Sequence, residues 1–317
     1  MPNPIRMKEL AERGDLLTGG HRACAGCACA TALRQAVMAA EDPVVVAFAT
    51  GCMEVSTTIY PYTAWKVPYI HTCFENAAAT ISGVEAAYHA FRRQGKFDKK
   101  VKFIAFGGDG GSYDIGIQAI SGAMERGHHM LYICYNNGAY MNTGIQRSSA
   151  TPRGASTTTA PPGRRSYGKK EYPKDLTEIM IAHGVPYAAQ STPAHHMDFM
   201  KKVRRALEIE GPTFINVLAS CNRGWRIPSE QSIEILRLAA DSCFWPIYEV
   251  DHGTYKITYR PREKKPILEW LQAQGRYQHL FRKGDNTALF EELQQDVDRR
   301  WERLQRMEKL WAETPQA

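Results

Sequence analysis

The sequence predicts an α/β protein built on a doubly wound, mainly parallel β-sheet. Four short apolar runs have the length and composition of buried strands, and stretches with helical apolar spacing lie between them. This alternation is typical of strand–helix–strand units, which form parallel sheets with helices on both faces. With 317 residues and 44% apolar content, the chain is long enough to bury a large core.

Each element follows from its own pattern. The expected strands are Val44–Phe48, Val101–Phe106, Leu131–Tyr135 and Thr213–Leu218. The expected helices are Ala77–Arg93, Asp114–Met124 and Leu176–Ala182. The segment Ser148–Lys170 is rich in Thr, Pro, Gly, Arg and Ser, which predicts a long loop. A long loop in a compact domain more often covers a site than extends freely.

The character of the chain changes beyond about residue 260. We therefore expect one domain over residues 1–262 and a mainly helical C-terminal extension over 263–317 that serves subunit packing. Apolar residues recur at helical spacing in this charged segment, at Leu289, Leu293, Val297, Trp301, Leu304 and Trp311. Such a stripe is a packing face, either on this chain or on a neighbouring subunit.

The formal net charge is +7, but Lys and Arg are scattered and no nucleic-acid-binding motif accompanies them. We expect no nucleic-acid partner, and a basic surface facing an acidic electron carrier or partner subunit accounts for the charge equally well. The first residues lack the apolar core of a signal peptide, and no apolar run has the length of a membrane span. These features favour a cytoplasmic chain with no membrane association.

A glycine-rich segment, Phe106–Ser112, follows the second expected strand. Its glycines lie at a strand-to-helix turn, where backbone N–H groups can approach an anion. Mg²⁺ binds hard oxygen ligands and shares its coordination sphere with phosphate and water, so Asp109 and Asn137 are a sufficient protein share. The segment matches neither the dinucleotide fingerprint, because Tyr113 stands three positions after Gly110, nor a P-loop. Glycine-aspartate-glycine with asparagine 28 positions after the aspartate is the diphosphate motif of thiamine-dependent enzymes, and a structural turn is the alternative.

Eight cysteines in a chain expected to stay in a reducing compartment indicate a metal or redox site rather than disulfides. Cys24 and Cys27 form a C-x-x-C pair, while Cys52 and Cys221 each follow an expected strand. Four such thiolates suit an iron–sulfur cluster or a structural zinc, and the single C-x-x-C pair favours the cluster. Cys29 is an alternative ligand. Otherwise we expect Cys29 and the remaining thiols, Cys73, Cys134 and Cys243, to be buried and unreactive.

Seven segments together carry a resemblance to a known family. They are Cys24–Cys27, Thr50–Val55, Pro61–Pro68, His71–Asn76, Gly107–Gly111, Ala139–Ser148 and Arg226–Glu230. Over about residues 18–282 the chain resembles the beta subunit of pyruvate:ferredoxin oxidoreductase, within the 2-oxoacid:ferredoxin oxidoreductases. The resemblance implies the fold of a thiamine diphosphate-binding domain.

The resemblance also implies three cofactors: thiamine diphosphate, Mg²⁺ and one 4Fe-4S cluster. The implied cluster ligands are Cys24, Cys27, Cys52 and Cys221. The implied magnesium ligands are Asp109, Asn137 and the main-chain carbonyl of Ala139. The implied cofactor-binding residues are Gly51, Cys52, Gly108, Asp109, Gly110, Asn137, Asn142 and Thr143. Asn142 is the implied catalytic residue, because an amide beside the thiazolium can polarise a developing anion.

The implied reaction is oxidative decarboxylation of a 2-oxoacid, with pyruvate as the first candidate, to acyl-CoA and CO₂. Electrons pass singly through the cluster to ferredoxin or a similar carrier. We expect a hetero-oligomer in which a pyrimidine-domain subunit supplies the glutamate that activates the cofactor, and another subunit carries ferredoxin-like clusters. The expected docking faces are the Leu289–Trp311 stripe and the surface around the Ser148–Lys170 loop.

Other interpretations remain open. The same scaffold could act on oxalate, phenylglyoxylate or a branched-chain oxoacid, or the chain could be a non-catalytic interaction subunit with a structural zinc. His71, Glu75 and Glu54 are acid–base candidates that are equally well structural. The chain departs from the family at Asn136-Asn137-Gly138, where Asp-Asn-Glu is expected, and at Gly154–Thr157, which lacks an expected aromatic residue.

Overall fold

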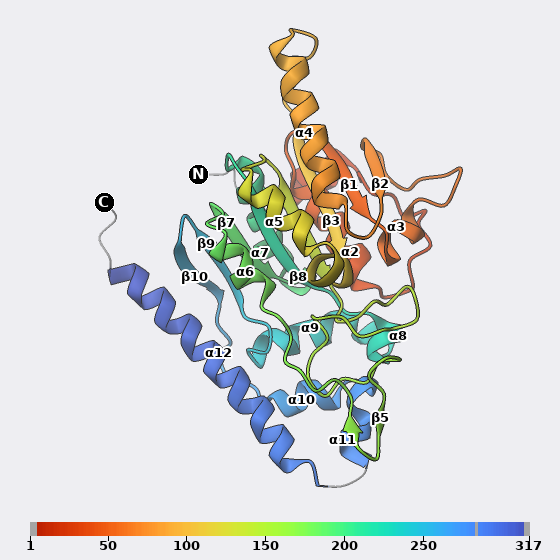
Figure 1. The fold of residues 1–317 in the computed structure, drawn as a ribbon, viewed down its shortest axis with the longest axis vertical. Coiled ribbons are helices and arrows are strands. Elements are labelled where there is room, and N and C mark those ends of the chain that lie inside the picture. Colours follow the sequence, from red (N-terminus) through yellow and green to blue (C-terminus); the bar gives the residue numbers. More distant parts are fainter. Residues whose placement is uncertain (1–4, 283–284, 314–317) are drawn as a thin grey trace.

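The computed structural model describes residues 5–282 and 285–313, and an eight-stranded sheet lies at its centre (Figure 1). The strand order is β10-β9-β7-β8-β4-β3-β1-β2. The four predicted strands are confirmed as β1 (Val44–Ala49), β3 (Lys102–Gly108), β4 (Leu131–Asn136) and β8 (Thr213–Leu218). They are neighbours and run parallel, so the prediction of a mainly parallel sheet is confirmed.

Four further strands of this sheet were not predicted. They are β2 (Tyr69–Thr72), β7 (Tyr187–Ser191), β9 (Ile247–Asp251) and β10 (Thr254–Tyr259). β2 and β7 extend the parallel set, whereas β9 pairs antiparallel with β7 and β10 pairs antiparallel with β9. The buried strand β7 reads Tyr-Ala-Ala-Gln-Ser, which has little of the β-branched character that marks a strand in the sequence.

Helices cover both faces of the sheet, as the doubly wound prediction requires. α4 (Ala77–Arg93), α5 (Ile117–Glu125) and α6 (Leu176–Ala182) pack on one face. α2 (Ala28–Ala39), α7 (His196–Glu208) and α9 (Ser232–Asp241) belong to the core on the other face. Successive strand residues separate the two cores: Phe106 belongs to the α2–α7 side and Ala105 to the α4–α5 side.

The predicted helices over residues 77–93 and 176–182 are confirmed, but the one expected over Asp114–Met124 is not continuous. A π-helical segment, η1 (Gly110–Ile115), precedes α5. The wider π turn begins directly after Asp109, and such turns are frequent at functional sites. Apolar periodicity alone does not distinguish this wider turn from an α-helix.

The remaining elements are short, apart from the last helix. They are α1 (Met7–Arg13), α3 (Cys52–Thr57), β5 (Pro162–Gly163), β6 (Ser166–Tyr167), η2 (Pro193–His195), α8 (Asn222–Trp225), η3 (Ser229–Gln231), α10 (Ile267–Gln272), η4 (Gly275–Tyr277), α11 (Gln278–Arg282) and α12 (Thr287–Glu313). Within the described residues, none of the helices combines the length and apolar character needed to cross a membrane.

The C-terminal end is helical, as predicted, and α12 runs along the β9–β10 edge of the sheet (Figure 1). Its apolar stripe faces the chain itself, since Leu289, Leu293, Val297 and Leu304 are buried within its own cores. The prediction that this stripe docks a partner is therefore wrong for these four residues. At the far end of the stripe Trp311 remains exposed.

Candidate functional site

Asp109 and Asn137 lie at the carboxyl ends of β3 and β4, which are adjacent parallel strands. The backbone N–H of Asn137 donates to Asp109 Oδ1 at 3.1 Å, and Ser148 Oγ donates to Oδ2 at 2.5 Å. Asp109 is 1% exposed. This burial raises the pKa of its carboxyl to about 7, although the hydrogen bonds from Ser148 and Asn137 act in the opposite direction. A carboxylate so deeply buried requires a positive partner to stay ionised.

Two further oxygen atoms converge on this carboxylate. The side-chain oxygen of Asn137 lies 2.9 Å from Asp109 Oδ1 and 2.9 Å from the main-chain oxygen of Ala139. Rotating the amide by 180° would replace both contacts with hydrogen bonds, whereas in the observed orientation the amide nitrogen faces Cys29 Sγ at 3.8 Å. Adjacent ligands of an octahedral Mg²⁺, with bonds of about 2.1 Å, stand about 3 Å apart. The observed orientation fits a bound magnesium ion, and the rotated one fits an empty site.

One recess collects the residues implied for the cofactor. Its walls are formed by Thr50, Gly51, Cys52, Phe74, Gly108, Asp109, Gly110, Gly111, Tyr135, Asn137, Ala139, Tyr140, Met141, Asn142 and Thr143. All eight predicted cofactor-binding residues are among them. Asn142 and Thr143 are exposed at this recess, where a bound molecule can reach them.

Glycine is required where backbone forms the wall of the recess. Tyr140 OH donates to the carbonyl of Gly110 at 2.9 Å, and a Cβ atom at Gly110 would lie 2.3 Å from the Tyr140 ring. A Cβ at Gly51 would lie 2.6 Å from Tyr135 OH. Glycine at these two positions lets the backbone pack closely against Tyr135 and Tyr140, and the glycines add backbone atoms to the wall of the recess, which suits an anionic diphosphate.

The four predicted cluster cysteines come from three segments: the loop before α2, the start of α3 and the residue before α8. Asn222 Nδ2 donates to the carbonyl of Ala25 at 2.9 Å and so attaches the C-x-x-C loop to α8. Burial raises the pKa of Cys52 to about 12, and the charges of Cys221, Cys27, Asp109 and Cys24 add to this effect. The thiols therefore lie within electrostatic reach of one another and of the predicted metal site.

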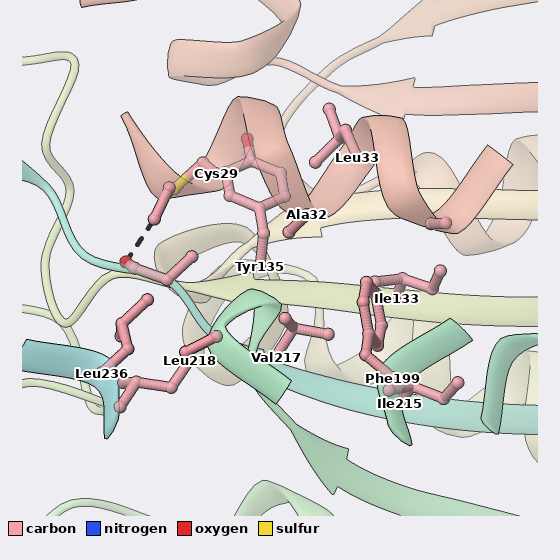
Figure 2. Close-up of a cluster of buried hydrophobic side chains, with 14 of the residues drawn as sticks. Cys29, Ala32, Leu33, Ile133, Tyr135, Phe199, Ile215, Val217, Leu218 and Leu236 are labelled. Carbon is pink, nitrogen blue, oxygen red and sulfur yellow. Dashed lines mark hydrogen bonds between the residues drawn. The ribbon is translucent and has the colours of Figure 1, made fainter. Parts of the chain in front are cut away.

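The pKa values of the Cys27 and Cys29 thiols are shifted in opposite directions. A hydrogen bond with Cys29 lowers the pKa of Cys27 to about 6, whereas the same bond and burial raise the pKa of Cys29 well above its usual value. Cys29 is 1% exposed and its Sγ faces the carbonyl of Ala219 at 4.0 Å (Figure 2). This arrangement favours Cys27 as the thiolate and Cys29 as a buried donor.

Of the other thiols, Cys134 and Cys243 are buried, as predicted. The prediction that Cys73 is buried is wrong, because it follows β2, the edge strand of the sheet, and is exposed. No three His, Cys, Asp or Glu side chains of residues 5–282 and 285–313 are grouped closely enough to hold a single metal ion.

Two residues that contact the predicted magnesium ligands, Ser148 and Trp225, could not be predicted from the sequence. Ser148 is fully buried and holds the Asp109 carboxylate, although nothing in the sequence pairs it with that residue. Trp225 Nε1 donates to the carbonyl of Asn137 at 2.6 Å and fixes the loop from the side of α8. Both contacts join residues far apart in the sequence, and no motif spacing indicates them.

The three acid–base candidates do not all lie at the recess. His71 Nε2 lies 2.8 Å from Thr50 Oγ1 and 3.5 Å from Glu54 Oε2, and Thr50 lines the recess. Glu54 is buried and accepts a hydrogen bond from Thr58 Oγ1 at 2.6 Å. Glu75 is not among the residues that line the recess. The structure therefore brings His71 and Glu54 together near the recess but leaves Glu75 outside it.

The departures from the family are accommodated locally. Asn136 Oδ1 accepts from the backbone N–H of Gly138 at 3.0 Å, and its Nδ2 donates to Tyr113 OH at 3.1 Å. The long Ser148–Lys170 loop packs against the body of the protein, since Thr151 Oγ1 donates to the carbonyl of Gly138 at 2.8 Å. An amide thus closes the turn where an aspartate was expected.

The fold and the site define a thiamine diphosphate-binding domain. In agreement, residues 49–217 match the family model described as thiamine pyrophosphate enzyme, C-terminal TPP binding domain. A solved structure titled 2-oxoglutarate:ferredoxin oxidoreductase from Magnetococcus marinus has the same fold, with a TM-score of 0.52 and 22% identity over 68% of this chain and 76% of that one.

Sequence comparison narrows the class. The chain is 49% identical to pyruvate synthase subunit PorB of Thermotoga maritima over 98% of this chain and 99% of the relative. It is 42% identical to ketoisovalerate oxidoreductase subunit VorB of Pyrococcus furiosus, over 98% and 99%. The chain belongs to the family of the thiamine diphosphate-binding beta subunits of pyruvate:ferredoxin oxidoreductase, and it is an oxidoreductase subunit.

Proposed function

We propose that this chain is the thiamine diphosphate-binding subunit of a complex that oxidatively decarboxylates pyruvate, with coenzyme A as acyl acceptor and ferredoxin as electron acceptor. It would hold Mg²⁺ and one 4Fe-4S cluster besides the thiamine cofactor. The observation that carries the proposal is the convergence of the Asp109, Asn137 and Ala139 oxygens beside a glycine-walled recess. These atoms are hard ligands spaced for Mg²⁺, and backbone groups that suit a diphosphate surround them.

The protein's own share in the reaction follows from its residues. Thiamine diphosphate, when bound, supplies the ring that accepts the electron pair released on decarboxylation. Asp109, Asn137 and Ala139 hold the metal that anchors the diphosphate. Asn142, exposed at the recess, is positioned for its amide to donate to the oxoacid oxygen as charge develops there.

For the cluster we propose Cys24, Cys27, Cys52 and Cys221 as ligands and Cys29 as a non-ligand. The support is their mutual electrostatic coupling and the opposite characters of Cys27 and Cys29. Cys52 also lines the cofactor recess, which would place the cluster next to the electron source. A non-catalytic zinc subunit is the weaker candidate, because a single zinc requires a compact tetrahedral ligand group.

Partner subunits complete the proposed enzyme, since its relatives are named as subunits. One would carry the pyrimidine-binding domain and its activating glutamate, and another the ferredoxin-like clusters. Between α3 and β2, Tyr60 is 94% and Tyr62 77% exposed, which supports coverage of this region by a partner. We propose residues 1–262 as the cofactor domain and 263–317 as the helical extension. The complex would be cytoplasmic, where its eight free thiols stay reduced.

The oxoacid is proposed as pyruvate because identity is higher to the pyruvate synthase subunit than to the ketoisovalerate oxidoreductase subunit over the same share of the chain. A branched-chain oxoacid is the second candidate. An activity panel of pyruvate, 2-oxoisovalerate, oxalate and phenylglyoxylate on the co-purified complex distinguishes them. Higher kcat/KM for any oxoacid other than pyruvate would overturn the substrate assignment.

Metal analysis tests the cofactor assignment. We expect anaerobically purified protein to contain about four iron atoms with matching sulfide and no stoichiometric zinc. Cys24→Ser and Cys221→Ser should lose most of the iron, whereas Cys243→Ser, a buried thiol elsewhere in the fold, should keep it. One zinc per chain without iron, or iron lost in Cys29→Ser but kept in Cys27→Ser, would contradict the proposal.

A further inference from the structure

A second, larger cavity lies on the other side of the loop that carries Asn137. It has a volume of about 190 Å³ and lies between the sheet, the 172–178 segment and α12. Asn136 and Gly138, the residues on either side of Asn137, line it, but Asn137 itself lines only the cofactor recess. The two cavities therefore share this loop as a wall and are separate sites.

Arg276 lines this cavity and is 2% exposed. Its only side-chain hydrogen bond within the described residues runs from Nε to Gln274 Oε1 at 2.8 Å, and Nη2 is buried without a partner. The guanidinium carbon lies 4.1 Å from the centre of the Trp225 ring. Aromatic faces attract a cation but accept few of its N–H donors. The guanidinium is thus a buried cation with unused donors.

No carboxylate of the described residues forms an ion pair with Arg276. Of the acidic residues that line the cavity, Asp296 is paired with Arg300 at 2.9 Å and Glu178 with Arg303 at 3.2 Å, while Asp175 accepts from the backbone N–H of Glu178 at 3.1 Å. Burial lowers the pKa of Arg276, although the charges of Tyr277, Cys221 and Asp109 act in the opposite direction without forming an ion pair. A buried cation with unused donors is destabilising, so an anion in the cavity would be strongly favoured.

The walls indicate the class of anion. Seven aromatic side chains line the cavity: Tyr113, Tyr172, Trp225, Phe244, Trp245, Tyr248 and Tyr255. One unpaired guanidinium suits a monoanion, and its planar fork matches a carboxylate in two parallel hydrogen bonds. The volume is below the roughly 300–1,000 Å³ of pockets for drug-sized ligands, so the occupant is small.

We propose that this cavity binds a small organic monocarboxylate, with its carboxylate on Arg276 and its apolar body between the aromatic walls. The site is distinct from the thiamine recess and does not depend on the reaction that the complex performs. Phenylacetate is a suitable probe because it joins one carboxylate to an aromatic ring. Phenylacetamide has the same shape without the charge.

Calorimetric titration of the purified full chain tests the proposal. Phenylacetate should bind at one site per chain, and phenylacetamide should bind at least tenfold more weakly. Arg276→Gln should weaken phenylacetate binding at least tenfold, whereas Arg282→Gln, an exposed arginine on α11, should leave it unchanged. Equal affinities for the acid and the amide, no binding of phenylacetate, or unchanged binding in Arg276→Gln would each overturn the proposal.

A second variant keeps the test decisive if Arg276→Gln fails to fold. Met307 lines the cavity from α12 and is only partly buried, so Met307→Trp narrows the cavity without touching the guanidinium. We expect this variant to bind phenylacetate with at least tenfold lower affinity. Wild-type affinity in Met307→Trp, or binding of inorganic phosphate in place of phenylacetate, would show that the cavity is not a site for organic carboxylates.

Discussion

Replacing Asp109 with Asn should stabilise the metal-free chain and at the same time abolish its response to Mg²⁺. Burial raises the pKa of the Asp109 carboxyl from an ordinary 3.8 to about 7. Because the folded pKa is raised, the carboxyl costs no stability below pH 3.8, and the cost grows as pH rises toward 7. At pH 8 the difference corresponds to about 4 kcal/mol, at 1.36 kcal/mol per pKa unit.

An asparagine at this position avoids that cost and keeps the local contacts. Its Oδ1 can still accept from the backbone N–H of Asn137, and its amide can donate to Ser148 Oγ. Thermal unfolding of EDTA-treated protein should therefore show the variant melting several degrees above the wild type at pH 8, with a much smaller gap at pH 5. Added Mg²⁺ and thiamine diphosphate should stabilise only the wild-type complex. An equal or lower melting temperature for Asp109→Asn at both pH values would refute the argument that this carboxylate is an uncompensated buried charge.

Two further predictions concern the same recess. Ser148→Ala removes a charge-assisted hydrogen bond to Asp109, worth about 1.5–3 kcal/mol, and should weaken magnesium-dependent binding of thiamine diphosphate roughly tenfold or more at pH 7, with a smaller loss at pH 9. Calorimetry on the complex at both pH values checks this, and a loss independent of pH would count against it. Gly110→Ala places a Cβ 2.3 Å from the Tyr140 ring and should abolish cofactor binding. Gly83→Ala, in α4 with no atom within 4 Å of the added carbon, is the matched control and should bind normally with stability raised by about 0.5–1 kcal/mol.

The core of the fold could be predicted because its central strands are mostly apolar. β1, β3, β4 and β8 are covered on both faces, so each appears as a largely hydrophobic run, although β8 includes the buried Asn216. The edge strands β2 and β10 were not predicted, because neither is a continuous hydrophobic run. β2 has exposed residues, among them Ile70 at 38%, and β10 alternates between buried and partly exposed positions.

The site could be predicted in part, for a similar reason. Asp109 and Asn137 follow recognisable strands, so the parallel sheet brings them to one edge whatever the loops do. Ser148 comes from a loop 39 residues beyond Asp109, and its contact depends on how that loop packs. Arg276 comes from the last third of the chain, and no spacing relates it to Trp225, whose ring it covers.

Two buried charged residues, Asp109 and Arg276, connect the cofactor recess with the second cavity. Asp109 and Arg276 are a buried carboxyl and a buried guanidinium on opposite sides of the loop formed by residues 136–139, and the charge of Asp109 raises the pKa of Arg276 without forming an ion pair with it. A chain selected for stability alone would join them or replace both with apolar residues, which is often the more stable choice. Keeping them apart leaves each side of the loop with an unsatisfied charge of defined sign. Such a separation is favourable only if a cation completes one side and an anion the other, so the metal site and the carboxylate cavity are two consequences of one arrangement.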